Sequence, residues 1–295
     1  MPPAIDIPIT SYSKALKARN ELVSILSALV KKSRMENVSN AANHHKNNIL
    51  SVLLQPKSIQ SGDEEPSFFD DEEIIDTLLV FIFAASDTSS CTMTWIMKKL
   101  VEDCDIFNKL KKEHEQIIIA RHNDDDDSHD NDSHDNILTY QEIEKATYTK
   151  KVINEALRSV SVVGATPREA TEDLYYKDYI IPKGSKIIVD LCTLSSDPNN
   201  FPSPETFDPD RSFEPQRERE HQNQNQRHNA FLPFGYGVKM CIGNRLAMIE
   251  MTTMIHHLVL GYEWEVSPDA KAEFTYFPIP KIDDRLSIKI TKVHC

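Results

Sequence analysis

From residue 234 to residue 245 the chain reads Phe-Gly-Tyr-Gly-Val-Lys-Met-Cys-Ile-Gly-Asn-Arg. Three of the chain's seven glycines fall within nine positions here, around Cys241. Glycine lets the backbone turn sharply and approach a flat partner closely. A helix predicted to begin near Gly243 directs its unpaired N–H groups and the positive end of its dipole towards the sulfur. The pattern predicts a ligand loop with a thiolate at Cys241. The alternative is a buried structural cysteine beside a glycine turn.

Composition bounds the class of protein. A chain of 295 residues with 40% hydrophobic residues can bury one large core or two small ones. The net charge of -13 argues against nucleic-acid binding, although seven Asp between residues 122 and 136 supply about half of it. Five cysteines without a Cys-x-x-Cys pair disfavour a zinc module or a disulfide framework and favour a reducing compartment. The longest apolar run, residues 74–85, is too short to span a bilayer, which predicts no membrane segment in this chain.

Periodicity predicts a mainly α fold with a small antiparallel β meander, in one domain over residues 1–295. The longest helix begins with acidic residues at position 70 and extends to about residue 100, a rod of about 45 Å. Polar tracts near 122–136 and 216–229 are predicted to be disordered inserts. Other helices are expected at 13–32, 105–119, 147–160 and from Gly243 to Gly261, the meander strands at 174–176, 179–181 and 186–189, and late strands at 274–280 and 286–290.

Glu155 and Arg158 stand three residues apart on a predicted helix and so share one face. A charge-assisted pair is expected between them. About fifty residues later the chain reads Phe-Asp-Pro-Asp-Arg, which ends at Arg211. The Glu-x-x-Arg spacing alone is weak evidence for a functional motif, and Arg211 makes that evidence stronger.

The middle of the long helix reads Ala84-Ala85-Ser86-Asp87-Thr88. Small residues there allow close approach of a ligand, and Asp and Thr side chains can transfer protons. The alternative for Thr88 is a hydrogen bond from its hydroxyl to the carbonyl four residues earlier, as any threonine within a helix can make.

In this order, these motifs resemble the cytochrome P450 family over nearly all of the chain, and they resemble only its C-terminal portion. The resemblance implies a P450 fold that is incomplete on its N-terminal side. It also implies haem b as cofactor, with Cys241 as axial ligand of the iron and Phe234, Gly235, Gly237 and Gly243 framing the loop.

The resemblance implies further roles at matching positions. Asp87 and Thr88 would deliver protons, and Ala84 and Ala85 would lie against the haem. Glu155, Arg158 and Arg211 would form a structural triad that braces the cysteine loop. Arg168 and Lys239 would contact the haem propionates.

The resemblance also implies a monooxygenase acting on a lipophilic substrate of the sterol, retinoid or terpenoid class, with electrons from an NADPH-dependent reductase. A full-length form would lie on the cytosolic face of the endoplasmic reticulum, held by an N-terminal anchor that is missing here. Two alternatives are a truncated, non-catalytic remnant and a haem-thiolate isomerase or dehydratase. The histidine pairs at 44–45 and 256–257 are predicted to be surface or helix-face residues.

Overall fold

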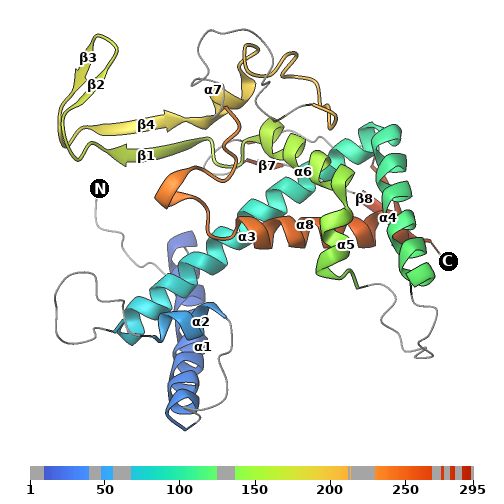
Figure 1. Cartoon of the computed structure of the whole chain (residues 1–295). Coiled ribbons are helices and arrows are strands. Elements are labelled where there is room, and N and C mark those ends of the chain that lie inside the picture. Colours follow the sequence, from blue (N-terminus) through green and yellow to red (C-terminus); the bar gives the residue numbers. More distant parts are fainter. Residues whose placement is uncertain are drawn as a thin grey trace. The chain divides into compact units, whose positions relative to one another are not determined.

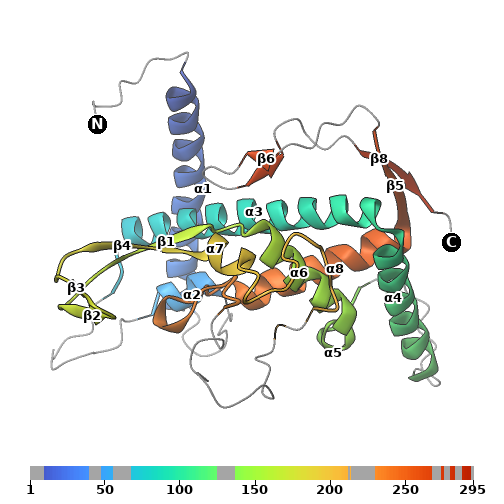
Figure 2. The ribbon, with the colours of Figure 1, turned by 90° about the horizontal axis from the view of Figure 1, so that it is seen from above.

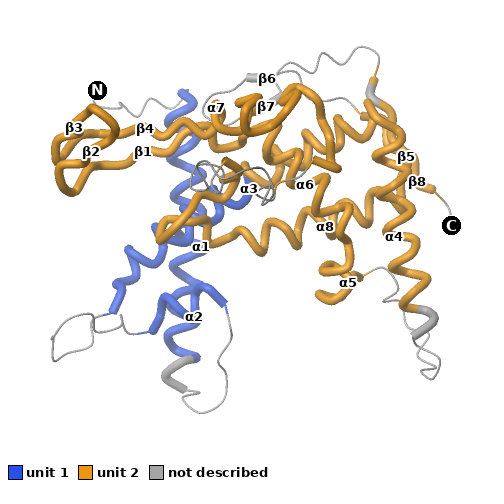
Figure 3. Tube along the Cα trace, turned by 45° about the horizontal axis from the view of Figure 1, so that its top comes forward, with its two compact units in different colours: residues 1–86 blue, residues 87–295 orange. Residues whose placement is uncertain are grey.

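The computed structural model describes residues 10–39, 48–55, 68–124, 137–211, 213, 230–267, 274–275, 280–282 and 288–293. It divides into two compact units, residues 1–86 and 87–295 (Figure 3). The boundary falls within one long helix. The predicted insert at 216–229 and most of that at 122–136 lie outside the described residues, and the single domain stays a prediction.

The first unit contains α1 (Ser11–Ser39), α2 (Ile49–Leu53) and the N-terminal part of α3 (Asp71–Glu102). Its core consists of apolar side chains from α1 and α3. Two ion pairs join the same helices: the guanidinium of Arg34 lies 2.7 Å from the carboxylate of Asp71, and that of Arg19 lies 2.9 Å from Asp76. The buried residues of this core are Leu26, Val30, Ile74 and Ile75.

The second unit is built around α8 (Asn244–Gly261), which packs against α4 (Cys104–Asp124), α5 (Tyr140–Lys145) and α6 (Thr147–Val160) (Figure 2). Its core also takes apolar side chains from the C-terminal part of α3. The short α7 (Leu191–Ser196) and the 3-10 helix η1 (Gly237–Lys239) complete the helices described in this unit. The largest buried apolar residues of the core include Ile96, Leu110, Ile153, Met251 and Ile255.

Four antiparallel strand pairs accompany the helices (Figure 1). They are β1 (Ala165–Glu169) with β4 (Lys186–Asp190), β2 (Leu174–Tyr176) with β3 (Tyr179–Ile181), β5 (Tyr262–Val266) with β8 (Ile288–Lys292), and β6 (Phe274–Thr275) with β7 (Lys281–Ile282). The predicted meander differs in its pairing, because β4 pairs with β1 instead of β3. The sequence of β1 does not alternate between apolar and polar residues, because it contains Pro167 and two charged residues. The strand was therefore not predicted.

The mainly α fold is confirmed, and α3 qualifies one expectation. By length and composition α3 could cross a membrane, a test that the core helix of a globular fold also passes. The apolar run of residues 74–85 is only part of this 32-residue helix. Of the apolar window that passes this test, 11% is buried, and Met93, Ile96 and Leu100 of the same helix are buried in the core of the second unit.

Candidate functional site

The chain around Cys241 folds back on itself. Gly235 and Gly237 have φ angles of 72° and 70°, in the left-handed region that glycine adopts without a steric penalty. The backbone N–H of Cys241 donates to the carbonyl of Phe234 over 2.8 Å, and η1 lies between the two residues. The two glycines are therefore required by the turn that brings the cysteine back to the start of the loop.

The sulfur of Cys241 lies beside the N-terminus of α8. Gly243 is the N-cap residue of this helix, and a Cβ atom placed on it would lie 3.9 Å from Sγ of Cys241. The N–H groups of a first helical turn have no partner within the helix, and the helix dipole is positive there. The sulfur thus lies at the end of α8 where backbone N–H groups have no partner within the helix.

Cys241 is exposed, and so are the apolar side chains of its loop. Val238 is fully exposed, at 101%. Exposed apolar groups gathered in one short segment indicate a binding surface. An exposed thiol, a glycine frame, apolar side chains and the cation of Lys239 suit the iron, the flat macrocycle and the propionates of a haem. The exposed apolar residues are Tyr236, Val238, Met240, Ile242 and Leu246.

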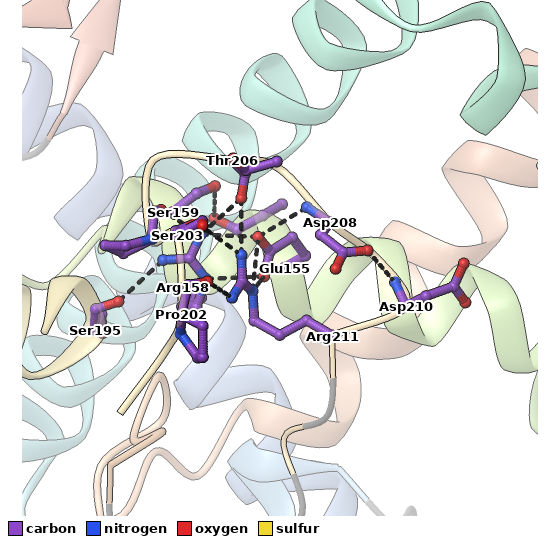
Figure 4. A network of polar contacts seen from close by, with 12 residues as sticks. Glu155, Arg158, Ser159, Ser195, Pro202, Ser203, Thr206, Asp208, Asp210 and Arg211 are labelled. Carbon is purple, nitrogen blue, oxygen red and sulfur yellow. Dashed lines mark hydrogen bonds and ion pairs between the residues drawn. The ribbon is translucent and has the colours of Figure 1, made fainter. Parts of the chain in front are cut away.

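The structure brings Glu155, Arg158 and Arg211 together in a buried ionic cluster (Figure 4). Arg158 contacts Glu155 through two parallel hydrogen bonds of 2.8 Å, from Nε to Oε2 and from Nη2 to Oε1. Nε of Arg211 lies 3.3 Å from Oε2 of the same carboxylate. The side chains of Glu155 and Arg158 are 0% and 1% exposed, so this pair is shielded from water.

Backbone carbonyl groups share the positive charge of the two guanidinium groups. Arg158 donates to the carbonyls of Ser195 and Pro204, over 3.0 and 2.8 Å, and Arg211 donates to those of Ser203 and Thr206. One carboxylate faces two guanidinium groups, and these acceptors satisfy the remaining N–H groups. The cluster therefore holds the segment 195–211 against α6.

The remaining predicted residues lie on separate elements. Asp87 and Thr88 are half-buried on α3, where the hydroxyl of Thr92 donates to the carbonyl of Thr88 over 3.1 Å. Ala84 and Ala85 are exposed on the part of α3 that belongs to the first unit. Arg168 is exposed on β1, where its Nη1 donates to the carbonyl of Pro167 over 2.8 Å, and Lys239 is exposed in η1.

His256 lies on a helix face, one of the two locations predicted for it, but that face of α8 is buried. His256 is 1% exposed, and its Nδ1 lies 3.1 Å from Nδ1 of His114 on α4. His257 is exposed as predicted, and residues 44–45 lie outside the described residues. The signal that was missed is spacing: His256 stands one turn from Thr252 and three residues before Val259, on the buried side of α8.

Comparison with known proteins connects these features. A sequence model of the cytochrome P450 family matches residues 1–287. The chain belongs to the cytochrome P450 family. Members of this family bind haem b, as the cysteine loop predicts. This P450 is 34% identical over 275 residues to abscisic acid 8'-hydroxylase 3 of Oryza sativa subsp. indica, a match that covers 93% of this chain and 49% of the relative.

A second relative and a solved structure are also P450 proteins. Abscisic acid 8'-hydroxylase 4 of Arabidopsis thaliana is 34% identical over 278 residues, which cover 94% of this chain and 53% of the relative. The fold is similar to that of the retinoic acid bound cyanobacterial CYP120A1, with a TM-score of 0.73 and 24% identity, over 98% of this chain and 59% of that chain. The P450 fold is thereby confirmed. The chain spans about half the length of the curated relatives it matches.

Proposed function

We propose that this chain forms the haem-binding part of a monooxygenase that inserts one oxygen atom of dioxygen into a lipophilic substrate. The observation that carries the proposal is the exposed thiol of Cys241, framed by glycines and surrounded by exposed apolar side chains. When bound, haem b supplies the activation of dioxygen, and the protein supplies geometry and electrostatics.

Residues of this chain would hold the haem in three ways. Cys241 would bind the iron through its sulfur, which lies beside the N-terminus of α8. Arg168 and Lys239, both exposed, offer cations to the propionates. Small residues permit close approach to the macrocycle. In the cysteine loop these are Gly235, Gly237 and Gly243, next to Phe234, and the family resemblance implies the same role for Ala84 and Ala85.

Asp87 and Thr88 would move protons between solvent and the haem site. The carboxylate of Asp87 would take protons from solvent, and Oγ1 of Thr88 would pass them inward. This pair distinguishes a monooxygenase from the haem-thiolate isomerase or dehydratase alternative, which has no need of protons for oxygen reduction. The ionic cluster of Glu155, Arg158 and Arg211 would brace the structure behind the cysteine loop without reacting.

The relatives suggest the class of substrate. Abscisic acid 8'-hydroxylases act on abscisic acid, and the P450 of similar fold holds retinoic acid. We therefore propose a terpenoid or retinoid substrate, with sterols as a wider possibility. Electrons would come from an NADPH-dependent reductase, at the cytosolic face of the endoplasmic reticulum, where an N-terminal anchor would hold a full-length form.

Two lipophilic acids and a control test this function. A haem-loaded form of the chain, completed at its N-terminus with the corresponding half of the rice relative, is incubated with reductase, NADPH and abscisic acid, retinoic acid or lauric acid. Hydroxylated product from a terpenoid acid, measured by mass spectrometry, is the expected result. Product from lauric acid alone would overturn the substrate class, and no product from any of the three would overturn the monooxygenase.

A non-catalytic remnant is the second candidate, favoured by the apolar side chains that α3 exposes. Val80, Ile82 and Phe83 on α3 are 48–62% exposed, and exposed apolar faces of this kind favour aggregation. We expect the 295-residue chain by itself to give little soluble, haem-loaded protein. Soluble yield and haem stoichiometry measure this, and a stoichiometrically loaded, active product would remove the remnant from consideration.

Thr88→Ala tests the proton path in the completed enzyme. Loss of the hydroxyl is expected to divert reduced oxygen to hydrogen peroxide and to lower product formed per NADPH by about tenfold or more. Thr94→Ala is the matched control, because the hydroxyl of Thr94 donates to the carbonyl of Ser90 over 2.7 Å on the same helix. If both variants keep the parent's ratio of product to NADPH, Thr88 has no role in proton delivery.

A further inference from the structure

A buried pair of histidines links α4 and α8. His114 and His256 are 0% and 1% exposed. Their Nδ1 atoms lie 3.1 Å apart, and their rings meet edge to face at 74°. The proposed reaction uses neither residue. Their hydrogen-bond partners nevertheless determine which nitrogen of each ring carries a proton.

The direction of the hydrogen bonds begins at Glu113. The hydroxyl of Thr149 lies 2.7 Å from Oε2 of Glu113 and 3.0 Å from Nε2 of His114. An ionised carboxylate has no proton to give, so the hydroxyl donates its single proton to Glu113. The oxygen of Thr149 is then an acceptor, and Nε2 of His114 carries the proton of the next hydrogen bond.

The same reasoning continues across the pair. A neutral imidazole has one N–H group, so Nδ1 of His114 is an acceptor and Nδ1 of His256 must donate to it. Nε2 of His256 is then left without a proton. Burial lowers the pKa of each histidine from 6.5 to about 4, and for His256 the neighbouring His114 adds to this effect. Both rings are therefore neutral at pH 7.

The chain of hydrogen bonds ends in an acceptor that is not satisfied. Nε2 of His256 is buried and has no hydrogen-bond partner among the described residues, and the same holds for Oγ1 of Thr252. The two residues are four apart on α8 and so share one face of the helix. Buried polar atoms without a partner are costly, and a buried water molecule commonly satisfies such a pair.

We propose that His114 and His256 are fixed in opposite tautomers, and that Nε2 of His256 and Oγ1 of Thr252 together bind one buried water molecule. His114 carries its proton on Nε2, and His256 carries it on Nδ1. The water donates to Nε2 of His256, and the hydroxyl of Thr252 is its second partner.

The series of hydrogen bonds from Glu113 through Thr149 and His114 to His256, called the relay below, gives His256 a positioning role. It connects α8, which begins just after Cys241, with Thr149 at the start of α6. Because α6 also carries Glu155, the relay fixes the helix behind the cysteine loop relative to the helix of the ionic cluster. The role does not depend on the proposed reaction, so it can be tested without haem or substrate.

Tautomers are measured by NMR on the N-terminally completed form used for the activity test, labelled with ¹⁵N-histidine. At pH 7 the expected long-range ¹H–¹⁵N patterns are those of a ring protonated on Nε2 for His114 and on Nδ1 for His256. His256→Gln and His257→Gln assign the signals, and His257→Gln is the control that leaves the pair unchanged. Reversed tautomers, or a doubly protonated ring at pH 7, would overturn the proposal.

Two further measurements address the ends of the relay. In Thr149→Val the acceptor for His114 is lost, so His114 is expected to exchange between tautomers. A crystal structure should show one water within hydrogen-bond distance of both Nε2 of His256 and Oγ1 of Thr252. If the electron density shows no water at this position, the proposed water site is wrong. If Thr149→Val does not fold, the tautomers of the parent chain still decide the proposal.

The pair also predicts a dependence of stability on pH. The pKa of each histidine is lower in the folded chain than in the unfolded one, so the unfolded state binds more protons between pH 6.5 and 4. The stability is complete above pH 6.5 and falls as the pH falls towards 4. The urea midpoint is expected to follow this course in the parent and in His257→Gln, and less steeply in His256→Gln. Equal slopes in the parent and His256→Gln would contradict a buried neutral pair. The charged or titratable groups that face the two rings are Glu113, Arg121, Glu142 and His257.

Discussion

Replacing Cys241 with serine is expected to abolish the thiolate-type Soret band of the reduced, carbon monoxide-bound protein. The sulfur is the proposed ligand of the iron, and a serine hydroxyl does not provide a thiolate. The glycine turn and the N-terminus of α8 remain in the variant, because neither depends on the side chain of Cys241. The measurement is the difference spectrum of the haem-loaded, N-terminally completed form, with and without carbon monoxide.

Cys104→Ser is the matched control for this experiment. Cys104 is also an exposed free cysteine, but it lies at the start of α4 and outside the glycine loop. We expect its variant to keep the parent spectrum. An unchanged thiolate-type band in Cys241→Ser, or its loss in Cys104→Ser, would show that another cysteine holds the iron and would remove the main support for the proposed function.

The sequence predicted local features of this chain well, because they depend on short spacings. The turn around Cys241 follows from glycines four and six residues before it, and the boundary of α8 at Gly261 follows from periodicity. The pairing of Glu155 with Arg158 follows from their separation of three residues on a helix. The proximity of Arg211, fifty-six residues from Glu155, was expected only through the family resemblance.

Features that depend on how distant elements pack were not predicted. His114 and His256 are 142 residues apart, and their contact depends on how α4 and α8 pack together, which no spacing reveals. The pairing of β4 with β1 was missed for a similar reason, because strand partners are selected by the packing of the whole unit. The roles of Asp87, Thr88, Arg168 and Lys239 remain predictions, and Thr88→Ala tests that of Thr88.

Arg158→Ala is expected to destabilise the chain by about 3–5 kcal/mol, since it leaves the buried carboxylate of Glu155 with only Arg211 and the backbone N–H of Asp208 as partners. That loss is a large part of the roughly 5–15 kcal/mol that stabilises a typical domain. The variant also removes the donors to the carbonyls of Ser195 and Pro204, so segment 195–211 is expected to detach from α6. Urea unfolding, followed by circular dichroism at pH 7, measures the effect.

Three further variants rank the contacts of the cluster. Arg158→Lys keeps the charge but not the two-pronged hydrogen bond, so an intermediate loss is expected. Arg211→Ala should cost less than Arg158→Ala, because Arg211 contacts Glu155 at 3.3 Å instead of 2.8 Å. Lys151→Ala is the control. Lys151 also lies on α6, and its replacement removes an exposed ion pair with Asp210. The expected loss of stability is about 1 kcal/mol or less. If Lys151→Ala destabilised the chain as much as Arg158→Ala, the buried cluster would not be the contact that holds this segment, and its proposed bracing of the cysteine loop would be wrong.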